Sequence, residues 1–179
     1  MRKILLLFVF LFSLFMTSQK TFSQQAIIGT KANYISSSSI LEFPDNDTRG
    51  VVLPKVDSSV VVGAVEGTLI FDVLDKKVKY CTGNGMWEDL SINEGVVDTA
   101  MQDGLSEVSG ARTLIGNDAN ISTEGVLVLD STNQALVLPR VESPHLKMIS
   151  PSSGTIVYDT KSNMICIFNG KEWAFWGNE

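Results

Sequence analysis

The sequence predicts an all-β protein made of two tandem, small β-meander repeats, joined by a glycine-containing linker with room for one short helix. The same order of short motifs occurs twice, the motifs are rich in β-branched and aromatic residues, and polar glycine- or asparagine-containing turns separate them. The predicted boundaries are a leader at residues 1–23, a first repeat at 24–90, the linker at 91–111 and a second repeat at 112–179.

The leader has the order of a secretory signal peptide. Arg2 and Lys3 precede an apolar run at residues 4–16, and Thr21 and Ser23 place small side chains just before a cleavage site at Gln24. The run is shorter than the about 20 residues that a membrane-spanning helix needs. We therefore expect export to the periplasm, cell surface or extracellular space, with no membrane span in the mature chain.

The charge of the chain argues against a nucleic-acid partner. The chain has 14 basic and 20 acidic residues, and cleavage after Ser23 removes three basic residues and no acidic one. The mature chain then keeps 11 basic and 20 acidic residues, a formal charge of −9. Such a surface repels phosphate backbones.

Each repeat has the same succession of blocks. The first has Ile-Gly-Thr at residues 28–30, Gly-Val-Val-Leu-Pro-Lys-Val at 50–56 and Gly-Thr-Leu-Ile-Phe-Asp at 67–72. The second has Ile-Gly-Asn at 115–117, Ala-Leu-Val-Leu-Pro-Arg-Val at 135–141 and Gly-Thr-Ile-Val-Tyr-Asp at 154–159. Pro54 and Pro139 lack the N–H that a central strand donates, so their segments are predicted at an edge, a bend or a strand end.

The end of the chain predicts a three-stranded meander. The block at 154–159 is followed by the apolar residues 164–168, by Asn169 and Gly170, and by a returning segment at 171–176. Asn-Gly between apolar runs favours a two-residue type I′ turn, whereas residues 82–85 predict a looser turn in the first repeat. Asp72 and Asp159 recur at the same strand end, which favours turn capping over an acid/base pair.

No catalytic, cofactor-binding or metal-binding constellation is predicted. His145 is the only histidine, and no motif fixes an acid beside it. The acidic segment at 45–50 resembles the start of a calcium loop, but Arg49 and Val56 occupy positions where ligands are needed. The sequence therefore predicts a protein that is not an enzyme and has no cofactor.

Four aromatic residues are candidate ligand contacts. Trp87 and Trp173 close the two repeats, which favours packing in the core, although their faces would also suit a sugar ring. Phe175 and Trp176 are consecutive, so in a strand they point to opposite faces, and one of them is a candidate contact residue.

Two questions stay open at this level. Cys81 and Cys166 either pair after export or remain buried thiols. Thr99 and Ser131 follow aspartates in triplets that resemble the O-glycosylation motif of exported Bacteroidota proteins.

Taken together, the motifs resemble a repeat of secreted surface proteins of Bacteroidota-type bacteria that is similar to modules of phage tail fibres. The second copy matches at residues 138–140, 151–160 and 169–173. The first lacks the proline before Gly67 and has residues 60–65 in place of the usual polar stretch. The resemblance implies an extended, commonly trimeric, surface-exposed assembly without shared catalytic residues.

The predicted function is that of a non-enzymatic, secreted structural or adhesive module of the cell surface. A glycan-binding accessory protein and a secreted hydrolase with scattered carboxylates are the alternatives. We expect a homo-oligomer, with a trimer favoured, because repeats of about 60 residues bury little surface and a lone meander needs a cover. The linker is long enough to hold the repeats apart, although the two copies could instead cover each other. Other surface or appendage proteins and glycans are further candidate partners.

Overall fold

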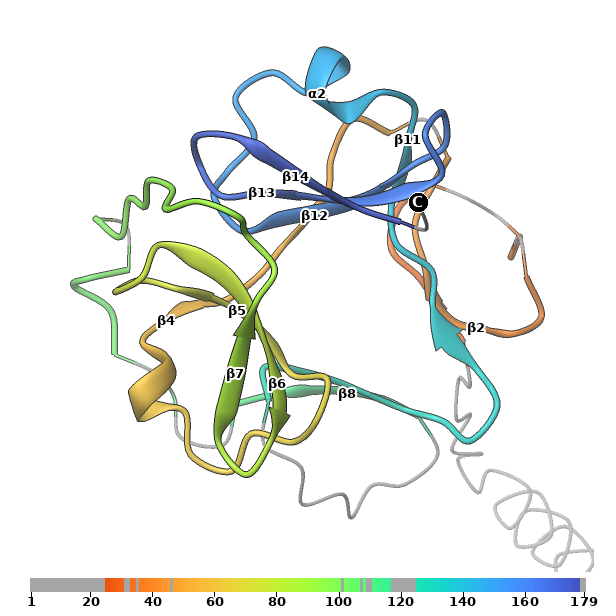
Figure 1. Ribbon diagram of the computed structural model, residues 1–179. Helices are drawn as coiled ribbons and strands as arrows, with labels where there is room; N and C mark the ends of the chain where they lie inside the picture. Colours follow the sequence, from red (N-terminus) through yellow and green to blue (C-terminus); the bar gives the residue numbers. More distant parts are fainter. Residues whose placement is uncertain are drawn as a thin grey trace, which may run out of the picture.

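The computed structural model describes residues 25–30, 33–34, 36–45, 47–100, 102–106, 108, 111–116 and 125–177. The predicted signal peptide and its cleavage site lie outside the described residues. The described chain is all-β, as predicted, and its sheets stand around a common centre (Figure 1). Within this part of the chain, no helix has the length and hydropathy to cross a membrane.

The strands of the first repeat are short and follow in this order: β1 (Ala26–Ile27), β2 (Ser39–Glu42), β3 (Val51–Val52), β4 (Lys55–Val56), β5 (Leu69–Asp72), β6 (Lys77–Gly83) and β7 (Met86–Asp89). The second repeat has the corresponding series: β8 (Thr113–Gly116), β9 (Leu127–Asp130), β10 (Ala135–Leu136), β11 (Arg140–Val141), β12 (Thr155–Asp159), β13 (Met164–Phe168) and β14 (Trp173–Trp176).

The same strand pairings occur in both series. In the first series β4 pairs in parallel with β5, and β5, β6 and β7 form an antiparallel meander. In the second series β11 pairs in parallel with β12, and β12, β13 and β14 form the corresponding meander. β1 pairs in parallel with β2, and β8 with β9. Pro54 and Pro139 stand just before β4 and β11, and their carbonyls accept hydrogen bonds from Phe71 at 2.8 Å and Tyr158 at 2.9 Å. Because proline has no N–H, the ladder of each parallel pair cannot extend backwards through it.

The turns of the two meanders differ from the prediction. β13 and β14 pair at Phe168 and Trp173, so their loop has four residues, and of its first two only Gly170 has a positive φ, of 93°. The predicted type I′ turn at Asn169 and Gly170 is therefore wrong. The type I′ pattern of two positive φ values occurs instead in the first repeat, at Asn84 (53°) and Gly85 (74°).

The buried Asn169 side chain explains the wider loop. Its Oδ1 accepts hydrogen bonds from the N–H groups of Lys171, at 2.9 Å, and Glu172, at 2.8 Å. The backbone N–H of Asn169 donates to the Glu172 carbonyl at 3.1 Å, so the asparagine closes a four-residue loop with its own side chain.

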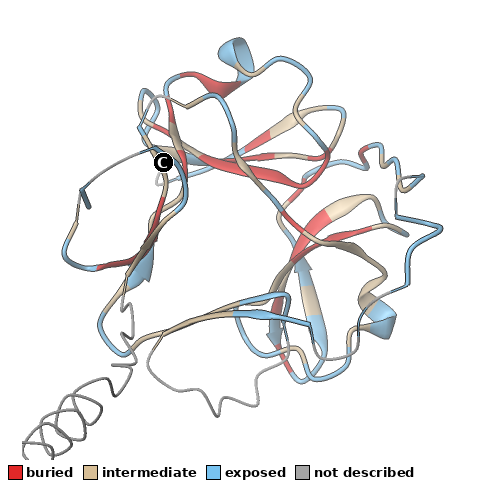
Figure 2. Cartoon of the chain, turned by 180° about the vertical axis from the view of Figure 1, so that it is seen from behind, coloured by how far each residue is buried: buried red, intermediate tan, exposed pale blue. Residues whose placement is uncertain are grey.

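The main core lies between the two repeats rather than inside either one. Leu53, Phe71 and Val78 of the first repeat form one buried cluster with Ile156 and Ile167 of the second. Figure 2 shows buried segments on the β5–β6 and β12–β13 strands and, apart from them, on β2. A smaller cluster of Val141, Val157 and Cys166 lies on the opposite face of β12–β13, packed against Met148 and Trp173. The repeats therefore cover each other within one chain, which is one of the two arrangements that the sequence left open, and the linker does not hold them apart.

The linker fastens the repeats together. Gly95 donates to the carbonyl of Lys76 at 2.9 Å, and Val96 donates to that of Asn169 at 3.0 Å. Asn93 accepts a hydrogen bond from Asn169 Nδ2 at 2.9 Å and donates one to Glu172 at 2.7 Å. The described linker residues contain turns and no helix. The helices of the described chain are a 3-10 turn, η1 (Ser58–Val60), and α2 (Pro144–Lys147).

Candidate functional site

Two strands leave their own repeat and pair with the other one. They are β3 and β10, which precede the Leu-Pro motifs, and we call them the linking strands. β3 lies antiparallel to β12, with Val52 opposite Thr155 and Val51 opposite Ile156. The next residue, Leu53, donates to the carbonyl of Gly154 at 3.0 Å. β3 therefore extends the meander of the second repeat by one strand.

The second linking strand makes the reverse connection. β10 pairs in parallel with β2, and the N–H groups of Ala135 and Val137 donate to the carbonyls of Ser38 and Leu41 at 2.8 and 2.9 Å. β2 thus lies between β1 and β10, and all four of its residues are buried. Strand exchange in both directions is the main feature of the contact between the repeats.

Gly50 permits the close approach of β3 to β12. A Cβ at this position would lie 2.5 Å from Thr155 Cγ2 and 3.0 Å from the Ile156 carbonyl oxygen. Sequence reasoning did not single out Gly50 or the exchange of the linking strands. The available signal was a glycine directly before a run of β-branched residues, which often marks a close backbone approach.

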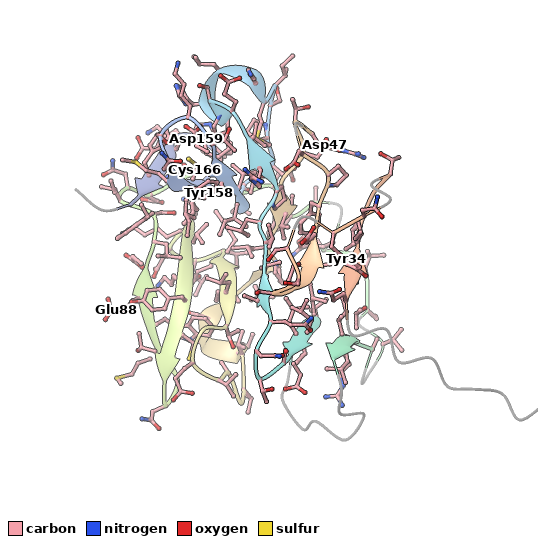
Figure 3. The ribbon with its side chains drawn as sticks, turned by 90° about the vertical axis from the view of Figure 1, so that its right-hand side faces the viewer. Tyr34, Asp47, Glu88, Tyr158, Asp159 and Cys166 are labelled. Atoms are coloured by element: carbon pink, nitrogen blue, oxygen red, sulfur yellow. The ribbon has the colours of Figure 1, made fainter. Side chains whose placement is uncertain are left out.

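Asp159 caps the turn that follows β12. It is 2 % exposed and accepts hydrogen bonds from the N–H groups of Ser143 and Lys161, both at 2.9 Å, and from Ser162 Oγ at 2.8 Å. Burial raises the pKa of this carboxyl, but the hydrogen bonds outweigh burial and hold the pKa below its usual value of 3.8. The carboxylate is thus used to hold a turn, next to Cys166 and Tyr158 in Figure 3.

Asp72 has the same place in the first repeat. It accepts hydrogen bonds from Ser58 Oγ at 2.5 Å and from the N–H groups of Leu74 and Asp75 at 2.9 and 3.3 Å. Lys79 Nζ lies 3.5 Å from it. Burial raises the pKa of Asp72, while these hydrogen bonds and the lysine charge lower it, with a net decrease.

The four aromatic candidates are divided between the core and the surface. Trp173 stacks at a tilt on Phe168, with ring centroids 5.2 Å apart, and it and Trp87 are half-buried. Trp176 is 45 % exposed, but its indole N–H donates to the Leu90 carbonyl at 2.7 Å and so joins the two repeats. Phe175 is 41 % exposed and meets His145 of α2 edge to face at 5.6 Å. The structure does not gather these residues into one binding face.

The other candidate groups stay apart from one another. Cys81 and Cys166 are free, buried thiols, and burial followed by the charge of Asp159 raises the pKa of Cys166 to about 12. Arg49 forms an ion pair with Asp47 in the segment that resembled a calcium loop. Among the described residues, no group of three or more histidine, cysteine or acidic side chains could hold a metal ion.

The fold and these contacts define a class of protein: an all-β chain of small repeats that exchange strands. Residues 114–178 match the model of a family described as the phage tail like trimerisation region. The second repeat is thus similar to this family, in agreement with the predicted likeness to tail-fibre modules, and the first repeat lies outside the match. No curated protein and no solved structure matches the chain significantly.

Proposed function

We propose that the protein is a non-enzymatic structural module of a secreted, tail-fibre-like or cell-surface assembly, and that it works by associating with copies of itself into a trimer. The single observation that carries the proposal is the similarity of residues 114–178 to a phage tail-like trimerisation region. An exported protein of this kind acts by its shape and its contacts with other subunits.

The strand exchange supports this proposal. Each repeat offers a linking strand that leaves its own sheet and an edge that receives a linking strand from elsewhere. In this chain the donor and the acceptor are two repeats of one molecule. The same backbone pairing between molecules would build an oligomer without any new kind of contact.

The use of the buried carboxylates also favours a structural role. Asp72 and Asp159 each accept three hydrogen bonds, two from the turn that follows and one from a serine 14 or 16 residues upstream, which leaves little capacity for a substrate. Adhesion, and partners such as other surface proteins or glycans, remain predictions from the sequence.

Sedimentation velocity with mass determination on the purified exported protein tests the proposal. We expect a species with three times the monomer mass at micromolar concentration, and a midpoint of thermal unfolding that rises with protein concentration. A monomer at every concentration, with an unfolding midpoint independent of concentration, would contradict the trimer.

A further inference from the structure

We infer that residues 67–69, at the start of β5, form the docking edge for a linking strand from a second copy of this chain. We call these residues the open edge. The inference rests on the proposed self-association and adds the place and the register of the contact between copies.

The open edge is the counterpart of an edge that is already occupied. Gly67, Thr68 and Leu69 correspond to Gly154, Thr155 and Ile156 in the repeated motif, and both glycines have a φ of 83°. On β12 these three residues face the linking strand β3. On β5 the parallel neighbour β4 pairs only at Phe71 and Asp72, and no described strand pairs with residues 67–69 on that side.

Burial shows the same difference. Thr155 is 2 % exposed and Gly154 is buried, whereas Thr68 is only half-buried and Gly67 is exposed. A Cβ at Gly154 would come within 3.1 Å of Phe71 Cβ, but one at Gly67 would have no neighbour within 4 Å. Glycines with the same φ at equivalent places are thus covered in one repeat and uncovered in the other.

The backbone at the open edge is ready for pairing. Thr68 accepts a hydrogen bond from Cys81 of β6 at 2.8 Å, and Phe71 donates to Pro54 on the opposite side at 2.8 Å. Because successive residues alternate between the two neighbouring strands, the N–H and C=O of Leu69 point away from β6. Pro54 has no N–H to offer the Leu69 carbonyl, so a strand from elsewhere can pair with it.

The two linking strands described in the structure both pair elsewhere. β3 pairs with β12, and β10 pairs with β2 on the far side of the molecule from β5 (Figure 1). In the part of the chain that the structure describes, β10 has a strand on one side only, and its Leu136 is 38 % exposed. Among the described strands, β9 pairs with β8 alone, although its counterpart β2 lies between two strands. An acceptor edge and a donor strand are therefore both available for a second copy.

The chemistry of the two surfaces is compatible. Residues 131–139 and residues 67–71 contain no charged side chain, so no pair of like charges would face each other within the contact itself. The turn that leads into the open edge exposes Val60 (68 %), Val62 (83 %) and Val65 (42 %). Docking of an apolar strand would remove part of this apolar surface from water.

Disulfide trapping between copies tests the inference. One chain carries a first tag and the substitution Thr68→Cys. It is mixed with a chain that carries a second tag and the substitution Val137→Cys. A parallel experiment uses Val52→Cys in the second chain instead. In the observed register Val52 stands opposite Thr155 in a pair next to the Leu53–Gly154 hydrogen bond. Such non-hydrogen-bonded pairs have Cα atoms about 4.5 Å apart, which suits a disulfide.

Three controls accompany this experiment. Val52→Cys with Thr155→Cys in one chain should form a disulfide within that chain. Thr82→Cys, on the exposed part of β6, should form none with Val137→Cys. The native Cys81 and Cys166 are 1 % and 0 % exposed, so the parent protein should stay unlinked.

We expect a covalent dimer that carries both tags, with the larger yield for Val137→Cys because one side of β10 is free. Thr68→Lys should raise the dissociation constant of the oligomer at least about tenfold, because a lysine on an edge strand discourages pairing with another strand. Thr82→Lys should leave the dissociation constant unchanged. A trimer that forms neither covalent dimer and tolerates Thr68→Lys would overturn the inference and leave the proposed function standing. A protein that stays monomeric would overturn both.

Discussion

Replacing Gly170 with alanine tests the contact between the linker and the loop that joins β13 to β14. Gly170 has a φ of 93°, and a Cβ there would overlap the Val96 carbonyl oxygen and lie 3.0 Å from Ser153 Cβ. The linker would have to move away, and the hydrogen bond from Val96 to Asn169, 3.0 Å long, would be lost or weakened.

Two contributions give the size of the effect. A non-glycine residue on the left-handed side of the backbone map costs roughly 1–2 kcal/mol. Loss of one backbone hydrogen bond adds about 0.5–1.5 kcal/mol. We expect the free energy of unfolding to fall by about 1.5–3.5 kcal/mol, which corresponds to a decrease of roughly 3–14 °C in the melting temperature of a chain of this size.

Gly85→Ala is the matched control. Gly85 also has a positive φ, of 74°, but a Cβ there would have no neighbour within 4 Å. Thermal and urea unfolding of both variants therefore separate backbone strain from the close approach. Hydrogen exchange at the Val96 amide should speed up in Gly170→Ala and stay unchanged in Gly85→Ala. If Gly170→Ala destabilises no more than the control, the linker does not pack against this loop as the structure shows.

Three further outcomes are expected. The free energy of unfolding should fall as the pH drops below about 4, because the folded pKa values of Asp72 and Asp159 lie below the usual 3.8. Asp159→Asn should make the free energy of unfolding less dependent on pH in this range. If acid titrations of the variant and the parent protein give the same pH dependence, the capping role of Asp159 is contradicted. Trp176→Phe should destabilise by about 0.5–1 kcal/mol, since it removes the hydrogen bond to the Leu90 carbonyl, and an unaltered urea midpoint would show that the bond contributes nothing. Mass spectrometry of the exported protein should give Gln24 as the N-terminal residue, and an intact Met1 would rule out cleavage there.

The positions of several strands were predicted correctly from local sequence patterns. Residues 154–159 and 164–168 are rich in β-branched and aromatic residues, and they form β12 and β13. The recurrence of Leu-Pro before β4 and β11 indicated a strand end, because the missing N–H of proline is a property of the residue itself. These features depend on neighbours in the sequence, so they can be read without the fold.

The turn types show where such reasoning fails. Asn-Gly occurs in both meanders, but a type I′ pattern occurs only at Asn84 and Gly85. At Asn169 the side chain bonds to Lys171, Glu172 and the linker residue Asn93, and these contacts favour a wider loop. The last contact comes from a residue 76 positions away, which no local rule includes.

The candidate site was predicted in its parts and not as a whole. The sequence indicated Asp72 and Asp159 as turn residues and left the aromatic residues divided between core and contact roles. It did not indicate that β3 would extend the sheet of the second repeat or that β10 would cover β2. The partner of a short apolar strand depends on which edges are free nearby, and that is known only once both repeats are folded.

By itself, the sequence determined the all-β class, the doubled order of strands and the positions of the proline breaks, because strand propensity and proline chemistry act over a few residues. Only the tertiary structure decided that the two repeats share one core, with Phe71 and Ile156 in the same cluster, and that the linker is bound to both. Only the tertiary structure distinguished the covered Gly154 from the uncovered Gly67, which occupy equivalent places in the repeated motif, are both followed by threonine and have the same φ. The physical reason is that burial and strand pairing are properties of surfaces brought together from distant parts of the chain.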